Sequence, residues 1–212
     1  MLVELMAAAL VCLDPGHGTL PSVGAQREPI GPGARELKIK DGGGAPGEAP
    51  VVLAVALRTR ELLLRRGYRV AMTRTRAGYA GGNVERARFC NTRGAALMLR
   101  IHADGSEDAS RSGAATLVPV PRPGWTDEIA AASRLAGALV QRALVRATGA
   151  RDLGVRPRSD LTGFNWANVP VILVETGFLT NASEGRRLRT AAYRERVAQG
   201  LAAGVATFVA RR

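Results

Sequence analysis

Apolar and polar positions alternate along the chain with two different periods, and the two periods follow one another in turn. Short apolar runs typical of buried strands lie at residues 9–14, 68–73, 96–102, 114–120, 153–156 and 170–175. Longer segments with apolar residues at helical spacing lie at 48–66, 83–93, 127–148 and 191–210. This alternation predicts a single α/β domain, with a mostly parallel or mixed twisted sheet of about six strands and helices on both faces.

The ends of the predicted helices are marked by residues with strong end preferences. Pro50 fits the first turn of the helix over 48–66, where no intrahelical N–H is lost, and Gly67 fits its C-terminal stop. Thr126 is expected to cap the helix over 127–148, and Gly149 follows its end.

Residues 21–47 differ from the rest of the chain because they are rich in glycine and proline and have no periodicity. They predict a long surface loop inside the domain, and such loops are usually functional or mobile. Because the segment leads straight into Glu48, we expect it to border the functional cleft.

The length of 212 residues suits one domain with a substantial core. The formal charge of +12 is carried almost wholly by arginine, because Lys38 and Lys40 are the only lysines. Such a charge favours anionic partners such as nucleic acid, acidic lipid or a cell-wall polymer. The arginines are dispersed over helices and few aromatic residues are present to stack on bases, which argues against nucleic acid.

The start of the chain and the two cysteines do not indicate a membrane protein, a signal peptide or a metal cluster. No window approaches the roughly 20 apolar residues that cross a bilayer. The opening segment "MLVELMAAALVCLD" has no basic leader and no clear cleavage site, so it is a poor signal peptide. Cys12 and Cys90 are too few for a metal cluster, and each is expected to be a small buried hydrophobic residue rather than a disulfide partner.

Four polar residues stand where the chemistry of an α/β protein is usually found, beyond the carboxyl ends of the strands. The two histidines of the chain, His17 in "VCLDPGHGTL" and His102 in "LMLRIHADGS", each follow an apolar run. Glu48 opens the first long helix, and Glu175 closes the apolar run "VPVILVET". Two imidazoles and one carboxylate are a usual ligand set for catalytic zinc, with the fourth position left for water. A second carboxylate can then act as the base.

Each of these residues also has an ordinary structural interpretation. A histidine at a strand end is often a hydrogen-bonded structural residue. Glu48 fits a helix N-terminal acid that the helix dipole favours, and Glu175 fits a core carboxylate in a salt bridge. The residue pattern alone leaves these alternatives open beside the zinc hydrolase.

The order of the motifs resembles that of the zinc-dependent N-acetylmuramoyl-L-alanine amidases of bacterial cell-wall turnover. "LDPGHG" resembles the opening histidine motif of that family, and "GEAPVVLAVALRTRELLLRRGYRVAMTRT" is similar to its glutamate-led helix and the following strand. "ERARFCNTRGAALMLRIHADGS" resembles the segment that carries the second histidine, and "VPVILVETGFLTN" the strand with the catalytic glutamate. The likeness covers nearly the whole chain, in the right order.

The resemblance implies that residues 1–212 form a zinc-dependent amidase catalytic domain. It makes His17, Glu48 and His102 the ligands of one zinc ion, and Glu175 the general base and then acid. The bond cut is the amide between N-acetylmuramic acid and L-alanine of peptidoglycan. Further candidates for contacting substrate or orienting the site are Arg74, Arg86 and Asn91. Arg86 fits a structural partner of a carbonyl equally well, and Asp14 is expected to have a structural role.

Two other functions are compatible with parts of the pattern. A zinc peptidase that cuts within the stem peptide uses the same four residues. A non-catalytic wall-binding module fits the positive charge, but such a module normally lacks one of the four, and none is missing. We expect a monomeric enzyme that acts on peptidoglycan in the periplasm, outside the cell or in the wall, and a phage lysis enzyme is the alternative setting.

Overall fold

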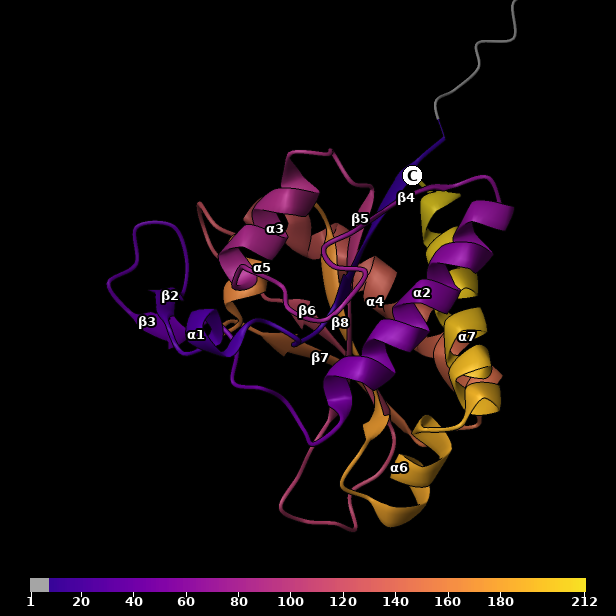
Figure 1. Cartoon of the computed structure of the whole chain (residues 1–212). Coiled ribbons are helices and arrows are strands. Elements are labelled where there is room, and N and C mark those ends of the chain that lie inside the picture. The colour runs from indigo at the N-terminus through magenta and orange to yellow at the C-terminus, as the bar shows by residue number, and fades with distance from the viewer. Residues whose placement is uncertain (1–7) are drawn as a thin grey trace, which may run out of the picture.

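A six-stranded sheet forms the centre of the domain, with helices on both sides of it (Figure 1). The computed structural model describes residues 8–212. The strands, in their order across the sheet, are β4 (Arg69–Met72), β1 (Leu10–Pro15), β5 (Leu97–Asp104), β8 (Val171–Phe178), β6 (Ala114–Pro119) and β7 (Asp152–Arg158). Neighbouring strands are parallel except β8 and β6, which are antiparallel. The predicted fold class and all six predicted strands are confirmed.

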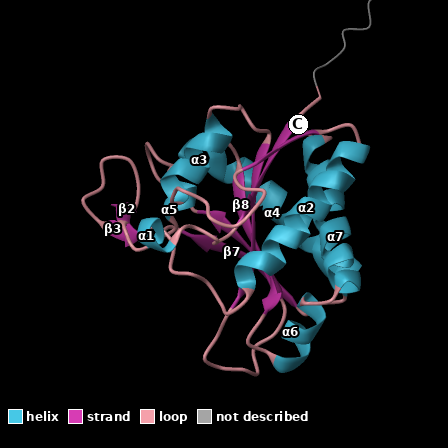
Figure 2. Ribbon diagram, viewed as in Figure 1, coloured by secondary structure: helices cyan, strands magenta, loops and turns pink. Residues whose placement is uncertain are grey.

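The helices divide between the two faces of this sheet (Figure 2). One face is covered by the long helices α2 (Glu48–Arg65), α4 (Asp127–Thr148) and α7 (Ala191–Val209), which pack on one another and on the strands. The other face is covered by the shorter α3 (Asn83–Asn91) and α5 (Thr162–Asn165). Two further short helices are α1 (Pro21–Gly24) and α6 (Ala182–Leu188).

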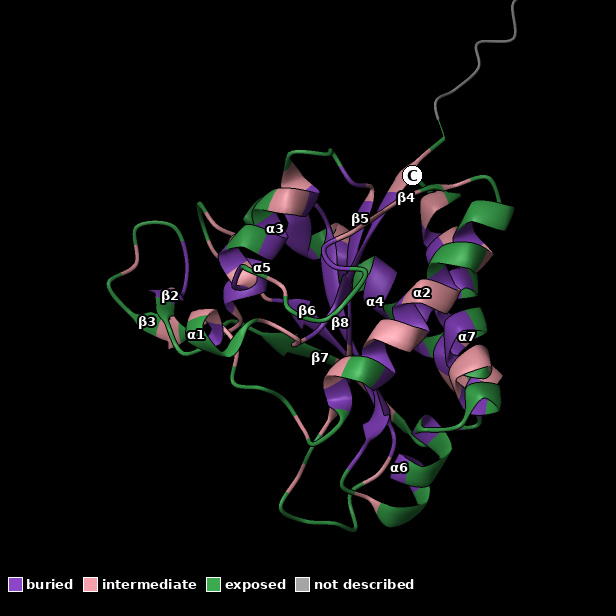
Figure 3. Cartoon of the chain, viewed as in Figure 1, coloured by how far each residue is buried: buried purple, intermediate pink, exposed green. Residues whose placement is uncertain are grey.

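The central strands are buried along most of their length (Figure 3). Their side chains alternate between the two helical layers, so both faces of the sheet receive apolar residues. In β5, Leu97, Leu99 and Ile101 belong to the core beneath α2, α4 and α7, whereas Met98 belongs to the smaller core beneath α3 and α5. The apolar runs of the central strands are continuous because both faces are covered.

The predicted helix ends are confirmed in position. Gly67 and Gly149 both adopt positive φ angles, of 81° and 66°, in the left-handed region that glycine enters without strain. Thr126 is the N-cap residue of α4, as predicted, but its side chain makes no capping hydrogen bond. Its hydroxyl instead donates to the carbonyl of Val120 and accepts from the N–H of Arg122, closing the preceding turn.

The segment 21–47 is not a structureless loop, because it contains α1 and a hairpin of β2 (Arg27–Pro29) and β3 (Leu37–Ile39). The Trp166 indole donates to the Pro29 carbonyl at 2.9 Å, and the Asn165 amide donates to that of Ile30 at 3.0 Å. These contacts fix the hairpin against α5. Strands of three residues are too short to produce a visible alternation, so the sequence did not predict them.

The two cysteines form a disulfide between β1 and α3, which corrects the expectation that they are separate buried thiols. Cys12 and Cys90 are both fully buried, and their Cα atoms lie 5.7 Å apart. That separation is typical of a disulfide. Cys12 faces α3 because of its position in the alternation of β1, and this orientation brings it against a residue 78 positions away.

The signal-peptide prediction concerns a segment whose residues 1–7 lie outside the described part of the chain. Within residues 8–212, no helix has the length and apolar character needed to cross a membrane.

Candidate metal centre and active site

The four polar residues singled out in the sequence lie together at the carboxyl ends of the central strands. His17 follows β1, His102 lies near the end of β5, and Glu48 is the first residue of α2. The parallel pairing of β5 with β8 sets His102 directly beside Glu175. Residues paired in this way project on the same side of the sheet, so the two side chains share one face.

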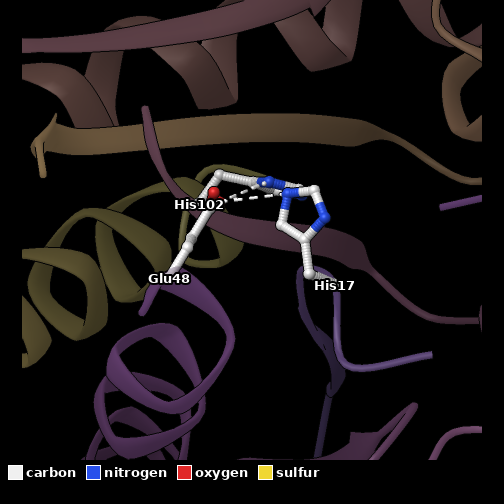
Figure 4. A group of neighbouring side chains, drawn as sticks. All are labelled: His17, Glu48 and His102. Carbon is white, nitrogen blue, oxygen red and sulfur yellow. Dashed lines mark hydrogen bonds and ion pairs between the residues drawn. The ribbon is translucent and has the colours of Figure 1, made fainter. Parts of the chain in front are cut away.

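His17, Glu48 and His102 converge on one point (Figure 4). Glu48 Oε1 lies 3.2 Å from His17 Nε2 and 3.1 Å from His102 Nδ1. The two imidazole rings meet edge to face, with centroids 4.9 Å apart and planes at 80°. All three residues offer a ligand atom within 4.8 Å of the others.

The backbone around these residues is held in a conformation that leaves little spare room. His17 has a φ of 54°, which is uncommon for a residue other than glycine and recurs at functional sites. A Cβ on Gly16 would lie 2.3 Å from the His102 ring, and one on Gly44 would lie 2.4 Å from a Glu48 oxygen. Glycine is therefore required at both positions for the backbone to approach the cluster.

Asp41 orients His17, and sequence reasoning missed it. Its Oδ1 lies 2.6 Å from His17 Nδ1, which leaves Nε2 turned toward Glu48. Its two oxygens also accept from the N–H groups of Gly43 and Thr19. A carboxylate on the far nitrogen of a histidine is the usual support of a metal ligand. The only local signal is the turn-forming sequence Asp-Gly-Gly at 41–43.

The contacts of Asp14 confirm its expected structural role. It lies in a buried ionic network on the face of the sheet that α3 and α5 cover. Its carboxylate accepts from Arg86 at 2.7 Å, Arg100 at 2.8 Å and the Thr73 hydroxyl at 2.6 Å. Burial by itself raises the pKa of Asp14, but the charges of Arg86 and Arg100 outweigh it and hold the pKa well below the usual range. Asp14 is therefore ionised inside the protein.

Arg74 and Arg86 support the His17 loop from within. Arg74 donates to the carbonyls of Pro15, Gly16 and Ala49, and Arg86 donates to those of Pro15 and His17. Both side chains are buried, and neither lines the cavity described below. The orienting role proposed for them thus agrees with their contacts, whereas direct contact with substrate does not.

Asn91 lies at the end of α3 and takes no part in the cluster. Its amide donates to the Trp166 carbonyl at 2.8 Å, and its oxygen accepts from the N–H of Asn168 at 2.9 Å. Its contacts join α3 to the segment after α5, so the expectation that Asn91 serves the site is not supported by its position.

The electrostatics of the cluster leave one carboxylate ionised. Burial raises the pKa of Glu48, but hydrogen bonds from His102 and His17 outweigh burial and hold the pKa well below its usual value. Burial lowers the pKa of His17, yet hydrogen bonds to Asp41 and Glu48 raise it to about 9. Burial keeps the pKa of His102 below its ordinary value, so this imidazole is neutral.

Glu175 differs from Glu48 because no side chain in the described part of the chain donates to it or forms an ion pair with it. Its Oε2 is buried without a hydrogen-bond partner among the described residues. Burial, together with the nearby charges of Asp104 and Glu48, raises the pKa of Glu175 well above the ordinary value. A carboxyl group with a raised pKa can take up and give back a proton near neutral pH.

The cluster fits a divalent metal ion on three grounds. Its donors are two imidazoles and one carboxylate, the ligand set of many catalytic zinc sites. The 3.1 and 3.2 Å separations match the roughly 3.3 Å between two ligands of one tetrahedral zinc ion. Each of the three residues offers one ligand atom, and these atoms all lie within 4.8 Å of one another, so a single ion can reach all three.

The cluster opens into a cavity of about 470 Å³ that is also lined by Glu175, Glu107 and Thr180. Residues 44–46 form part of its wall immediately before Glu48. The prediction that the segment 21–47 borders the cleft is therefore confirmed for its last part. The hairpin in its first part packs on α5 instead.

Comparisons with known proteins agree with this geometry. Residues 11–207 match the family model described as N-acetylmuramoyl-L-alanine amidase. An N-acetylmuramoyl-L-alanine amidase of Mycobacterium tuberculosis is 30% identical over 217 residues, which cover 97% of this chain and 88% of that protein. One of Bacillus subtilis is 29% identical over 198 residues, and the match covers 93% of this chain but only 35% of that longer relative.

The likeness extends to the whole fold. The crystal structure of an N-acetylmuramyl-L-alanine amidase from Mycobacterium smegmatis superposes with a TM-score of 0.87 at 26% sequence identity. The superposition covers 97% of this chain and 99% of that one. Since the family model also spans nearly all of the sequence, the chain belongs to the N-acetylmuramoyl-L-alanine amidase family.

Proposed function

We propose that the chain hydrolyses the amide bond between N-acetylmuramic acid and the L-alanine of the stem peptide in peptidoglycan. The observation that carries this proposal is the convergence of His17, Glu48 and His102 beside Glu175 in one open cavity. Relatives named for this activity span the same residues. The arginine-rich chain, with a net charge of +12, also suits an acidic polymer.

His17, Glu48 and His102 would hold one zinc ion, with Asp41 orienting the His17 ring. Zinc bound there supplies Lewis acidity toward the scissile carbonyl and lowers the pKa of bound water to about 7. The remaining chemistry belongs to the protein. The ionised Glu48 offsets the charge of the cation, and the Arg74 and Arg86 contacts keep the His17 loop in place.

Glu175 is the proposed general base and general acid. It takes the proton from the attacking water and then gives it to the leaving nitrogen. Both steps need a carboxyl group that holds a proton readily, and the raised pKa of Glu175 supports this role. Delivery of the proton matters because an amide anion is a very poor leaving group.

We further propose that the chain acts outside the cytoplasm, as a monomeric catalytic domain over residues 1–212. Peptidoglycan is the substrate of this family, and it lies outside the membrane. The buried Cys12–Cys90 disulfide supports the same location. Disulfides persist in oxidising compartments and are rare in the cytosol of mesophilic organisms.

Metal analysis and product analysis together test the proposal. The purified chain should contain about one zinc ion per molecule, lose hydrolysis on dialysis against a chelator and regain it with zinc. On a defined muropeptide, a released peptide that begins with L-alanine supports the amidase. A shortened stem that remains on the sugar identifies a peptidase instead. Binding of peptidoglycan without any product, in the zinc-loaded protein, identifies a wall-binding module.

A further inference from the structure

A second cavity adjoins the first along the side chain of Glu175. Its volume is about 440 Å³, and Asp104 and Glu175 line both cavities. Of the described residues, its lining includes none of the three proposed metal ligands. Glu175 therefore stands between the metal cluster on one side and this second cavity on the other.

Strand register explains why the space exists. On β6, Ala115 is the residue paired with Glu175, and the next residue on the same face is Leu117. The methyl group of Ala115 leaves room above the sheet between Glu175 and β7. Arg156 is paired with Leu117, and Arg158 follows two residues later, so both arginines project on this face.

The two cavities differ in their charged side chains, because only the second is lined by arginine. The charged residues of the first are the histidines and the carboxylates Glu48, Asp104, Glu107 and Glu175, and its lining contains no arginine or lysine among the described residues. The second contains three arginines, Arg111, Arg156 and Arg158, beside the two carboxyl groups Asp104 and Glu175 that it shares with the first. An anionic group is therefore favoured in the second cavity and disfavoured in the first.

Two of these arginines are available to a ligand. Arg158 is paired with Asp160, at 2.6 Å. Arg111 and Arg156 form no ion pair with any residue of the described chain. Arg156 donates only its Nε, to the Leu153 carbonyl at 3.2 Å, and Arg111 stands 5.3 Å from the ring centroid of Phe178. Their terminal nitrogens are suited to a bidentate grip on a carboxylate.

We propose that Arg111 and Arg156 form the subsite for the carboxylates of the stem peptide, on the leaving side of the scissile amide. The inference rests on the proposed function, because it follows from where Glu175 delivers its proton. The nitrogen that receives that proton begins the stem peptide. The peptide must continue from Glu175 away from the metal cluster, and the arginine-lined cavity is the space in that direction.

Peptide binding tests the subsite separately from catalysis. The probe is the dipeptide L-alanyl-D-glutamate, titrated into the full chain by calorimetry, against the same dipeptide with both carboxylates amidated. We expect the parent to prefer the acidic peptide. Arg156→Gln and Arg111→Gln should each weaken its binding about tenfold, since each removes a charged hydrogen-bond donor from a partly exposed site. Binding of the amidated peptide should be unchanged.

Arg142→Gln is the matched control, because Arg142 is exposed on α4 and lines a groove with α2 and α7 instead. Equal affinity of the parent for the two peptides overturns the subsite. Equal weakening by Arg142→Gln also overturns it, because the effect is then one of net charge. If the chain hydrolyses muropeptides but binds the acidic and amidated dipeptides equally, the subsite is refuted and the proposed function is not. Carboxylate-dependent binding without hydrolysis supports the subsite and refutes the proposed function.

Discussion

The two faces of the central sheet are built from the same strands but differ in what they contribute. In β5, Leu97, Leu99 and Ile101 point toward α2, α4 and α7, whereas Arg100 and His102 point to the other side. The first face is filled by apolar side chains and closed by long helices. The second is covered by two short helices, and it carries an ionic network and the site.

The comparison indicates that stability and chemistry are divided between the faces. Burial of apolar surface on the first face stabilises the fold without any demand for polar partners. On the second face, Asp14, Arg86 and Arg100 lose their contacts with water on burial. Ion pairs of Asp14 with the two arginines replace those contacts. That network also fixes the His17 loop, so changes on this face should affect activity, and changes on the first face should affect stability alone.

Glu175→Gln is the sharpest way to separate the two properties. We expect turnover to fall about 10³-fold, because the proton relay is lost. The zinc content should be unchanged. The free energy of unfolding should be unchanged or higher, since a poorly solvated carboxyl group is removed. Peptide release and thermal unfolding measure the two effects. Glu107→Gln, on the exposed rim of the same cavity, is the control and should retain activity within about twofold. Nearly full activity of Glu175→Gln would exclude it as the proton carrier.

Asp14→Asn should destabilise the face of the sheet that carries the ionic network. It leaves Arg86 and Arg100 buried without their counter-charge, which costs about 3–5 kcal/mol of stability. Denaturant unfolding measures this loss, and zinc affinity should fall as the His17 loop shifts. Glu61→Gln removes an ion pair at the surface of α2 and should leave the unfolding midpoint unchanged. An equally small effect of Asp14→Asn would contradict the importance of the network.

Gly204→Ala should destabilise the apolar face of the sheet and leave the activity of the site unchanged. A Cβ at Gly204 of α7 would lie 2.6 Å from the Val140 Cα of α4, so the two helices must separate. We expect a loss of about 1–2 kcal/mol after the gain in helix propensity, with kcat unchanged. In Gly137→Ala the new Cβ meets the Val118 side chain, which moves more readily than backbone, and the loss should be smaller. A selective loss of kcat in Gly204→Ala would show that the faces are coupled.

Acid below about pH 4 should destabilise the polar face gradually. The pKa of Asp14 is lower in the folded chain than in the unfolded one because Arg86 and Arg100 stabilise its charge against burial. Such a group contributes stability that is fully present above about pH 4 and is lost as the pH falls below it. Unfolding measured from pH 6 to pH 2 should show this decline, and Asp14→Asn should flatten it. A parallel decline in both proteins would assign the effect to other carboxyl groups.

The sequence predicted the elements and the site residues that depend on local pattern. Six strands and four helices follow from the period of apolar positions, and His17, His102 and Glu175 stand out because each closes an apolar run. Glu48 needed the resemblance to a family, because an acidic residue at a helix start is common. The short β2 and β3 were missed because three residues do not establish a period.

Only the tertiary structure decided which distant residues meet. Asp41 reaches His17 across 24 positions, and Cys12 reaches Cys90 across 78. Arg74 and Arg86 point inward to loop carbonyls, although as arginines in a basic chain they suggested contact with substrate. The physical reason is that strand register and helix packing set the direction of each side chain. These depend on pairings between segments far apart in the chain, which no local pattern records.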